Sequence, residues 1–249
     1  MPESVKIDDL LNRRSDLSTF VVHLTKDGEA SARENLARIL TTRTIEARKP
    51  MGWMGTRRER LKDRAHLDAM KVVCFSETPL EHVYSLFQDI PNRQTHLAPY
   101  GLAFSKHVVR EKGANPVWYV NMEAGFTWEI APALDSLREA AKANPAGFEA
   151  HPASKILPFI EQTGSWTSTR KDFSWEREWR HRGNFVFRDL DVALVVCPEP
   201  EIDEFEEYGP YAAVDPSWSL ERIVERLVLT RATYVSMEQR RIRRANIAS

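Results

Sequence analysis

Short apolar segments typical of β-strands alternate along this chain with segments whose apolar residues have helical spacing. The order of these segments most limits the folds that the chain can adopt. None of the strand-like segments is followed by the glycine-rich turn of a doubly wound nucleotide-binding sheet. Segments with helical spacing lie between them, without a regular strand–helix–strand rhythm. The order therefore predicts one α+β domain with a split, mostly antiparallel sheet flanked by helices. The segments rich in β-branched and aromatic residues are 17–25, 70–75, 100–105, 115–121, 175–181, 184–187 and 192–198.

Several helices carry signals of their own. Ser31 and Glu34 form an S-x-x-E capping box ahead of a helix. Thr78 followed by Pro79 is typical of a second helix start. The pattern over 127–161 is helical with breaks at prolines, and apolar residues at helical spacing predict a C-terminal helix over about 218–244, packed on the outside of the sheet. We expect one domain over 1–249, with its core at about 17–197.

Composition excludes several classes of protein. The chain has 249 residues and a net charge of −1, so no overall basic field would recruit nucleic acid or a membrane. It contains no apolar stretch long enough to cross a membrane, and its first residues lack a signal-peptide pattern. Cys74 and Cys197 lie inside apolar runs, as reduced core thiols do. Cytoplasm is the expected compartment, with no membrane partner.

Common catalytic motifs are missing from the sequence. The seven histidines are scattered without H-x-x-x-H or H-x-H spacing, and no C-x-x-C occurs, so no metal is expected. Neither a G-x-S-x-G elbow nor a glycine-rich phosphate loop is present. The sequence therefore gives no support to a serine hydrolase or to an enzyme with a phosphate-binding loop.

The segment DFSWEREWRH, residues 172–181, concentrates charges and large rings. An extended conformation from 175 to 180 would place Trp175, Arg177 and Trp179 on one face of a strand. Glu176 and Glu178 would share the other face with an arginine at 180. Adjacent carboxylates repel each other unless a cation or a bound group compensates them. The segment is either an ion-rich sheet edge or part of a site.

Other polar residues stand at the ends of the expected strands. His23 and Thr25 end the first strand, Ser76 and Glu77 end the second, and Tyr100 opens the third. Each has a structural interpretation, because a strand-end histidine is usually a satisfied structural group and Ser76 or Thr78 could cap a helix. Together with Glu178 they form a candidate site, since converging strand ends commonly build binding sites.

Four blocks of the sequence resemble a known family. FVVHLT…NLARIL, VVCFSETPL, YGLAFSKHVVREKGANPVWYV and WEREWRHRGNFVF, within residues 17–197, resemble AbiGi-type abortive-infection proteins of bacteria. The H-x-T…I-L opening and the late W-x-x-E-x-R segment are distantly similar to ADP-ribosyltransferases of the DarT type. That second resemblance implies a small split α+β sheet that grips NAD at strand ends.

The resemblance also implies roles for residues. Glu178 would grip a ribose hydroxyl of NAD and stabilise the oxocarbenium-like transition state, with Glu176 facing the acceptor. His23 matches the first cofactor-binding motif, with Thr25 beside it. Ser76 matches the second motif, and Tyr100 completes the set. NAD would be a substrate, and the protein would be a toxic effector of phage defence or of a toxin–antitoxin system.

The chain also departs from the transferase pattern. The catalytic arginine of the first motif has no firm counterpart, and the candidates are Arg43, Arg48, Arg57 and Arg58. The family is also linked with an antitoxin role, which needs no catalysis, so a binding protein that holds a cognate toxin or antitoxin is the alternative. The acceptor of an active enzyme would be a protein or a nucleic acid. Residues 57–64 and 240–244 are basic, although both are also typical of solvated helix surfaces.

Overall fold

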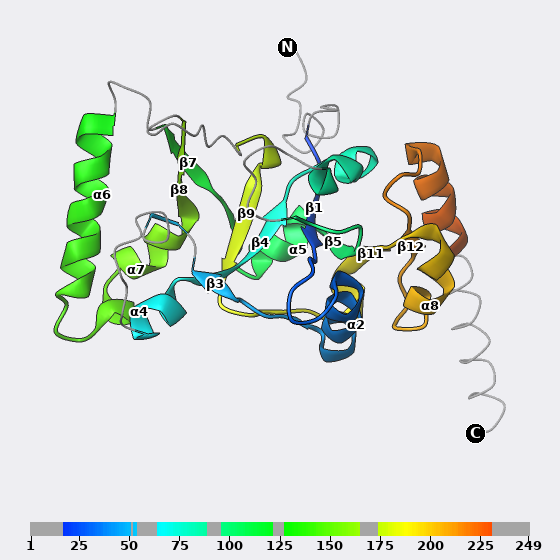
Figure 1. Cartoon of the computed structure of the whole chain (residues 1–249), viewed down its shortest axis with the longest axis horizontal. Helices are drawn as coiled ribbons and strands as arrows, with labels where there is room; N and C mark the ends of the chain where they lie inside the picture. The colour runs from blue at the N-terminus through cyan, green and yellow to red at the C-terminus, as the bar shows by residue number, and fades with distance from the viewer. Residues whose placement is uncertain are drawn as a thin grey trace, which may run out of the picture.

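The computed structural model describes residues 17–50, 52–53, 64–88, 96–121, 127–164 and 174–230. Its centre is an eight-stranded sheet (Figure 1). Neighbouring strands run antiparallel except for the parallel pair β11 and β12. In spatial order the strands are β12 (Ala213–Val214), β11 (Val192–Val196), β5 (Gly101–Ser105), β1 (Phe20–Leu24), β4 (Lys71–Ser76), β9 (Glu178–Arg182) and β6 (Asn115–Pro116), and β3 (Lys49–Pro50) pairs with β4.

Helices cover both faces of this sheet. One face carries Phe75 and Phe104 and packs against apolar side chains of α2 (Ala32–Thr42), α5 (Lys106–Glu111) and α8 (Ile202–Glu206). The other face carries Val22 and Ala103 and packs against the 3-10 helix η1 (Leu80–Phe87) and Ile223 of the helix at 220–230. The predicted mostly antiparallel sheet with flanking helices is confirmed. The ADP-ribosyltransferase type of sheet stays a prediction.

A second core lies beside the sheet, at the left of Figure 1, and we call it the β7–β8 unit. Its two strands, β7 (Trp118–Asn121) and β8 (Ile160–Thr163), run parallel. Trp53 and Met70 are buried in its interior. The remaining elements of the unit are α4 (Arg64–Ala69), α6 (Thr127–Lys142), η2 (Phe148–Ala150), α7 (Ala153–Ile156) and η3 (Leu157–Phe159).

Short elements complete the chain. A two-stranded sheet joins β2 (Thr44–Ile45) to β10 (Phe185–Val186). Single 3-10 turns occur at η4 (Ser174–Glu176), η5 (Asp189–Asp191) and η6 (Glu199–Glu201). The capping box of Ser31 and Glu34 is confirmed, since the Ser31 hydroxyl accepts from Glu34 N and the Glu34 carboxylate accepts from Ser31 N.

Three sequence predictions differ from the structure. Residues 160–161, the end of the segment expected to be helical, belong to β8, which pairs with β7 and buries Ile160 in the second core. Thr78 does not cap the next helix, whose N-cap is Pro79 without a side-chain bond. The strand expected from 175 starts only at 178, since Trp175 and Glu176 belong to η4. The C-terminal helix is described over 220–230, and the rest of its predicted range lies outside the described residues.

Candidate functional site

The candidate site lies where β4 ends and β9 begins. These strands are antiparallel, with Ser76 opposite Glu178 and Cys74 opposite Arg180. Directly opposed residues project from the same face of a sheet, so these four side chains share one face. Phe75 lies opposite Trp179 and both project from the other face. The end of β4 and the start of β9 therefore have two separate groups of polar side chains around them, one on each face of the sheet.

On the first face, Arg180 is fully buried and ion-paired. Its Nε donates to Glu178 Oε1 at 3.0 Å and its Nη2 to Glu178 Oε2 at 2.8 Å. Nη2 also donates to Glu161 Oε2 at 2.9 Å, and Nη1 donates to the Pro158 carbonyl at 2.8 Å. The Glu178 carboxylate thus lies against a buried cation, in the two-pronged geometry in which arginine binds carboxylates most strongly. The negative charge of Glu178 therefore compensates the positive charge of Arg180.

Two further ionisable side chains border this ion pair. Burial raises the pKa of the Cys74 thiol well above its ordinary value, and the nearby Glu178 charge adds to the rise. Burial likewise raises the pKa of the Tyr119 phenol, which accepts from Glu178 N at 3.3 Å. Both groups are therefore neutral at pH 7. Cys74 is unsuited to act as a nucleophile, because the thiolate is the reactive form.

On the second face, Glu77 is buried and holds three partners. The indole Nε1 of Trp179 donates to Glu77 Oε2 at 2.9 Å. Lys106 Nζ lies 2.9 Å and Arg177 Nη2 lies 3.3 Å from Glu77 Oε1. Arg177 adopts a positive φ of 46°, a conformation that costs an arginine free energy and persists only when the surroundings enforce it. The left-handed residue explains why the strand begins after 177.

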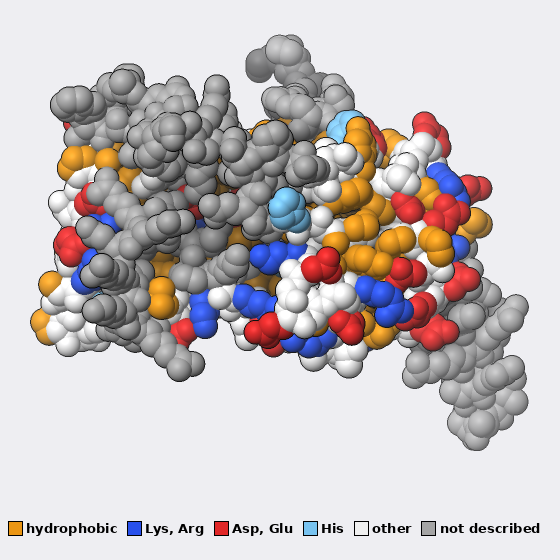
Figure 2. Space-filling view, in the orientation of Figure 1, with side chains coloured by type: hydrophobic (Ala, Val, Ile, Leu, Met, Phe, Trp, Pro, Cys, Tyr) orange, Lys and Arg blue, Asp and Glu red, His pale blue; other side chains and the backbone are white. Residues whose placement is uncertain are grey.

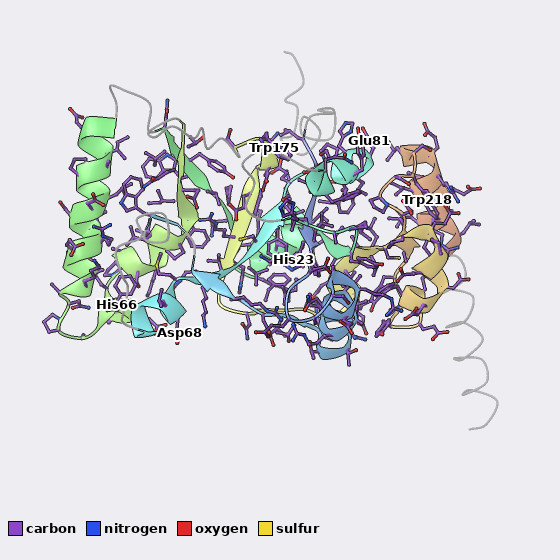
Figure 3. All side chains as sticks on the ribbon, viewed as in Figure 1. His23, His66, Asp68, Glu81, Trp175 and Trp218 are labelled. Carbon is purple, nitrogen blue, oxygen red and sulfur yellow. The ribbon has the colours of Figure 1, made fainter. Side chains whose placement is uncertain are left out.

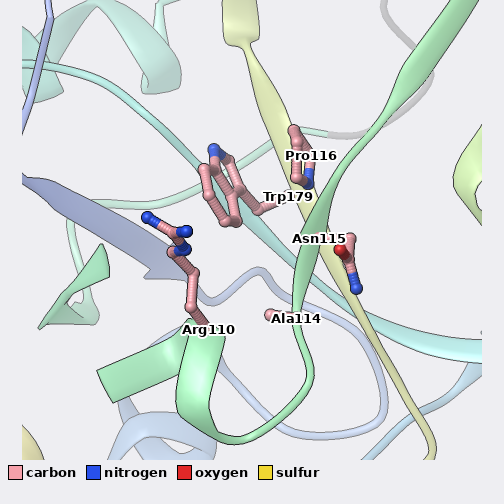
Figure 4. A pocket seen from close by; sticks show the side chains of 5 residues that line it. All are labelled: Arg110, Ala114, Asn115, Pro116 and Trp179. Carbon is pink, nitrogen blue, oxygen red and sulfur yellow. The ribbon is translucent and has the colours of Figure 1, made fainter. Parts of the chain in front are cut away.

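A shallow pocket of about 280 Å³ opens beside Trp179 (Figure 4). Arg110 reaches from α5 toward the indole ring, and Asn115 and Pro116 of the edge strand β6 form the facing wall. The sequence prediction did not include these pocket residues. Trp179 is the lining residue that the sequence placed on a strand face, and the structure buries it.

His23 lies on the opposite face of the sheet from Glu178. It pairs with Leu102 across β1 and β5 and contacts the Phe75 ring, with the ring centroids 5.9 Å apart. Its Nδ1 lies 2.8 Å from the Cys74 carbonyl oxygen, and burial lowers the pKa of the imidazole. Figure 3 places His23 in the middle of the sheet. A common site for His23 and Glu178 would therefore have to span the sheet.

Thr25 and Tyr100 meet each other rather than Glu178. The Thr25 hydroxyl bonds the carbonyls of Ala32 and Tyr100, and Thr25 N donates to the Tyr100 carbonyl at 2.7 Å. The Tyr100 hydroxyl donates to Glu201 at 2.6 Å. Burial and this bond raise the pKa of Tyr100 to about 12. Thr25 lies three residues beyond the level of Ser76 along β1, roughly 10 Å away.

The predicted alternation along 175–180 holds only from Glu178 onward. Trp175 is exposed and lies near the start of β9 in Figure 3, so it does not anchor the strand in the core. Glu176 is half-buried within η4 and does not share a strand face with Glu178. The structure thus brings Ser76 and Glu178 together, and it brings Thr25 and Tyr100 together. It places His23 two residues from Thr25 and on the other face of the sheet from Glu178, and it places Glu176 in η4 rather than on β9.

The arginines proposed for the first motif have other partners where they are described. Arg43 pairs with Asp189 at 2.5 Å, and Arg48 pairs with Glu46 at 3.3 Å. Arg57, Arg58 and the basic segment 240–244 lie outside the described residues, as does nearly all of 57–64. Within the described part of the chain, no group of three His, Cys, Asp or Glu side chains is arranged to hold a metal.

Sequence reasoning missed the residues that decide this geometry. Arg180 appeared only as a strand neighbour of the glutamates, and Glu161 lay in a segment expected to be helical. Glu77 was noted as a strand-end residue without its partners. The available signal was the pairing of charges within EWR at 178–180, because an arginine two residues from a glutamate on a strand lies on the same face.

One of the comparisons with known proteins finds a match, to a family of abortive phage resistance. A family model described as "Putative abortive phage resistance protein AbiGi, antitoxin" matches residues 53–193, more than half of the chain. The chain belongs to the AbiGi family. The match includes the Glu178–Arg180 pair and ends before the C-terminal helix. No curated protein and no solved structure matches the AbiGi chain significantly.

None of the helices in the described ranges combines the length and the apolar character needed to span a bilayer. Both described cysteines are free thiols.

Proposed function

We propose that this protein is a non-catalytic antitoxin of an abortive-infection system that restrains a cognate toxin by binding it. The observation that carries the proposal is the placement of Glu178 and His23. Glu178 compensates the buried Arg180, and His23 bonds the Cys74 carbonyl on the other face of the sheet. A carboxylate and an imidazole held in this way support the fold, and the family description supplies the antitoxin role.

Co-expression tests this proposal directly. Each gene that neighbours the coding sequence is expressed in a bacterial host, alone and together with this chain. We expect one of them to arrest growth alone and this chain to restore growth, with the two proteins co-eluting in size-exclusion chromatography. The proposal is wrong if this chain relieves no such arrest, or if it arrests growth by itself.

One observation favours a second candidate, an ADP-ribosyltransferase that consumes NAD. Ser76 and Glu178 lie side by side on β4 and β9, where the resemblance to DarT-type enzymes assigns a cofactor-binding residue and a catalytic residue. Incubation of the purified chain with labelled NAD and cell extract separates the two candidates. Label transfer or nicotinamide release that disappears in Glu178→Gln would support the transferase, whereas the antitoxin proposal expects neither.

A further inference from the structure

The helix at 220–230 has an apolar surface wider than the fold uses. Ile223 is buried against the sheet and Leu227 packs beside it. Leu220, Val224 and Val228 continue the same apolar arc at a spacing of four residues, yet they are 45%, 49% and 61% exposed. A surface helix of a globular protein normally turns such an arc toward the core. About half of this arc faces outward.

Charge is concentrated around this helix. Residues 198–230 contain nine carboxylates and two arginines, a net charge of −7, whereas the whole chain carries −1. Figure 2 shows acidic side chains gathered at the right-hand end of the molecule, the end formed by α8 and the helix at 220–230. Arg222 and Arg226 are already paired with Glu199 and Glu206. The end of the molecule is therefore strongly acidic.

The exposed apolar side chains have an acidic border on the same helix. At 100° per residue, Glu221 and Glu225 follow Val224 and Val228 around the helix, and both glutamates are exposed. We call Leu220, Val224, Val228, Glu221 and Glu225 the C-terminal surface. An apolar centre with a polar rim is the usual anatomy of a protein-binding surface.

We propose that the C-terminal surface binds the cognate toxin, and that the toxin presents an apolar patch bordered by lysines and arginines. The toxin should be basic where it binds, because residues 198–230 carry a net charge of −7 and like charges across an interface are strongly unfavourable. The apolar stripe supplies the contact area, and the acidic field speeds the encounter with a basic partner. The surface lies beyond residues 53–193, so it goes beyond what the family match covers.

This inference rests on the proposed function, and its test uses the toxin identified by growth rescue. The affinity of that purified toxin for full-length chain is measured for the wild type and for Val224→Asp with Val228→Asp. We expect about 100-fold weaker binding and loss of growth rescue, as for the truncation of central interface residues. Val224→Ala with Val228→Ala preserves helix propensity, and we expect it to weaken binding about 10-fold.

A charge variant tests the acidic border. Glu221→Gln with Glu225→Gln should slow association and reduce its dependence on salt, because rim charges act mainly on the association rate. The matched control is Leu137→Asp with Ile156→Asp, two exposed apolar residues of α6 and α7 at the other end of the molecule. The control should bind the toxin like the wild type, and all variants should retain the wild-type circular dichroism spectrum.

Two outcomes would overturn the inference, and they differ in whether the proposed antitoxin function is also wrong. If the wild type rescues growth and the folded C-terminal variants bind the toxin with wild-type affinity, the inference is wrong and the antitoxin function stands. If the wild type binds and neutralises no toxin, both the function and the inference are wrong.

Discussion

His23 is held in the sheet as a neutral side chain, because burial lowers the pKa of its imidazole. In the unfolded chain the same group titrates near pH 6.5. Below that pH the unfolded state therefore binds a proton that the folded state excludes. This contribution makes the free energy of unfolding fall as the pH decreases from about 6.5 toward the folded pKa.

The His23 contribution can be measured by urea unfolding at pH 7.5 and pH 5.5. We expect the wild type to lose about 1 kcal/mol through this group over that interval, and His23→Asn to lack that part of the loss. His107→Asn is the control, because His107 is largely exposed on α5 and its ion pair with Glu111 is exposed as well. If the stability of the wild type and of His23→Asn depended equally on pH, the folded protein would bind a proton at His23 as readily as the unfolded chain does. The neutral state assigned to His23 would then be wrong.

At the scale of single elements, local signals predict structure well when their partners lie close in sequence. The capping box of α2 is such a signal, since Ser31 and Glu34 satisfy each other's backbone groups. Ser31→Ala should lower the free energy of unfolding by about 1 kcal/mol, measured by urea denaturation. Ser136→Ala, within α6, should have a much smaller effect, because its exposed hydroxyl donates to the Pro132 carbonyl inside the helix and caps no helix end. Equal effects would mean that the cap is not formed.

The start of β9 shows why other elements could not be predicted. Alternation over 175–180 is a period-2 signal, but Arg177 is left-handed and interrupts it. Its conformation is enforced by contacts distant in sequence, such as the ion pair with Glu77 and the bond from Glu77 N to the Arg177 carbonyl. The same limit applies to β8, whose strand state depends on pairing with β7.

The candidate site also depended on topology that the sequence does not contain. His23 and Glu178 were both correctly placed on strands, and they became one site only on the assumption that strand ends converge. In an antiparallel sheet, neighbouring strands end at opposite edges, and the faces depend on register. The register sets Glu178 with Ser76 and sets His23 with Leu102 on the other face.

At the scale of the whole molecule, Arg180 joins the central sheet to the β7–β8 unit. It extends from β9 and donates both to the Pro158 carbonyl of η3 and to Glu161 of β8. Its side chain is fully buried and pairs with two carboxylates. Removal of one partner from a buried ion pair leaves an uncompensated charge, which costs more than the pair itself contributes.

Arg180→Met retains much of the side-chain volume and leaves Glu161 and Glu178 without their shared cation. We expect it to lower the free energy of unfolding by about 3–5 kcal/mol, measured by urea denaturation. Glu178→Gln should also destabilise, by about 2–3 kcal/mol, since Glu161 still compensates Arg180. The triple variant Arg180→Met, Glu161→Gln, Glu178→Gln removes all three charges, so it should recover part of the loss of Arg180→Met. If Glu178→Gln left stability unchanged while abolishing an NAD-consuming activity, Glu178 would be a catalytic residue, and the structural role assigned to its ion pair would be wrong.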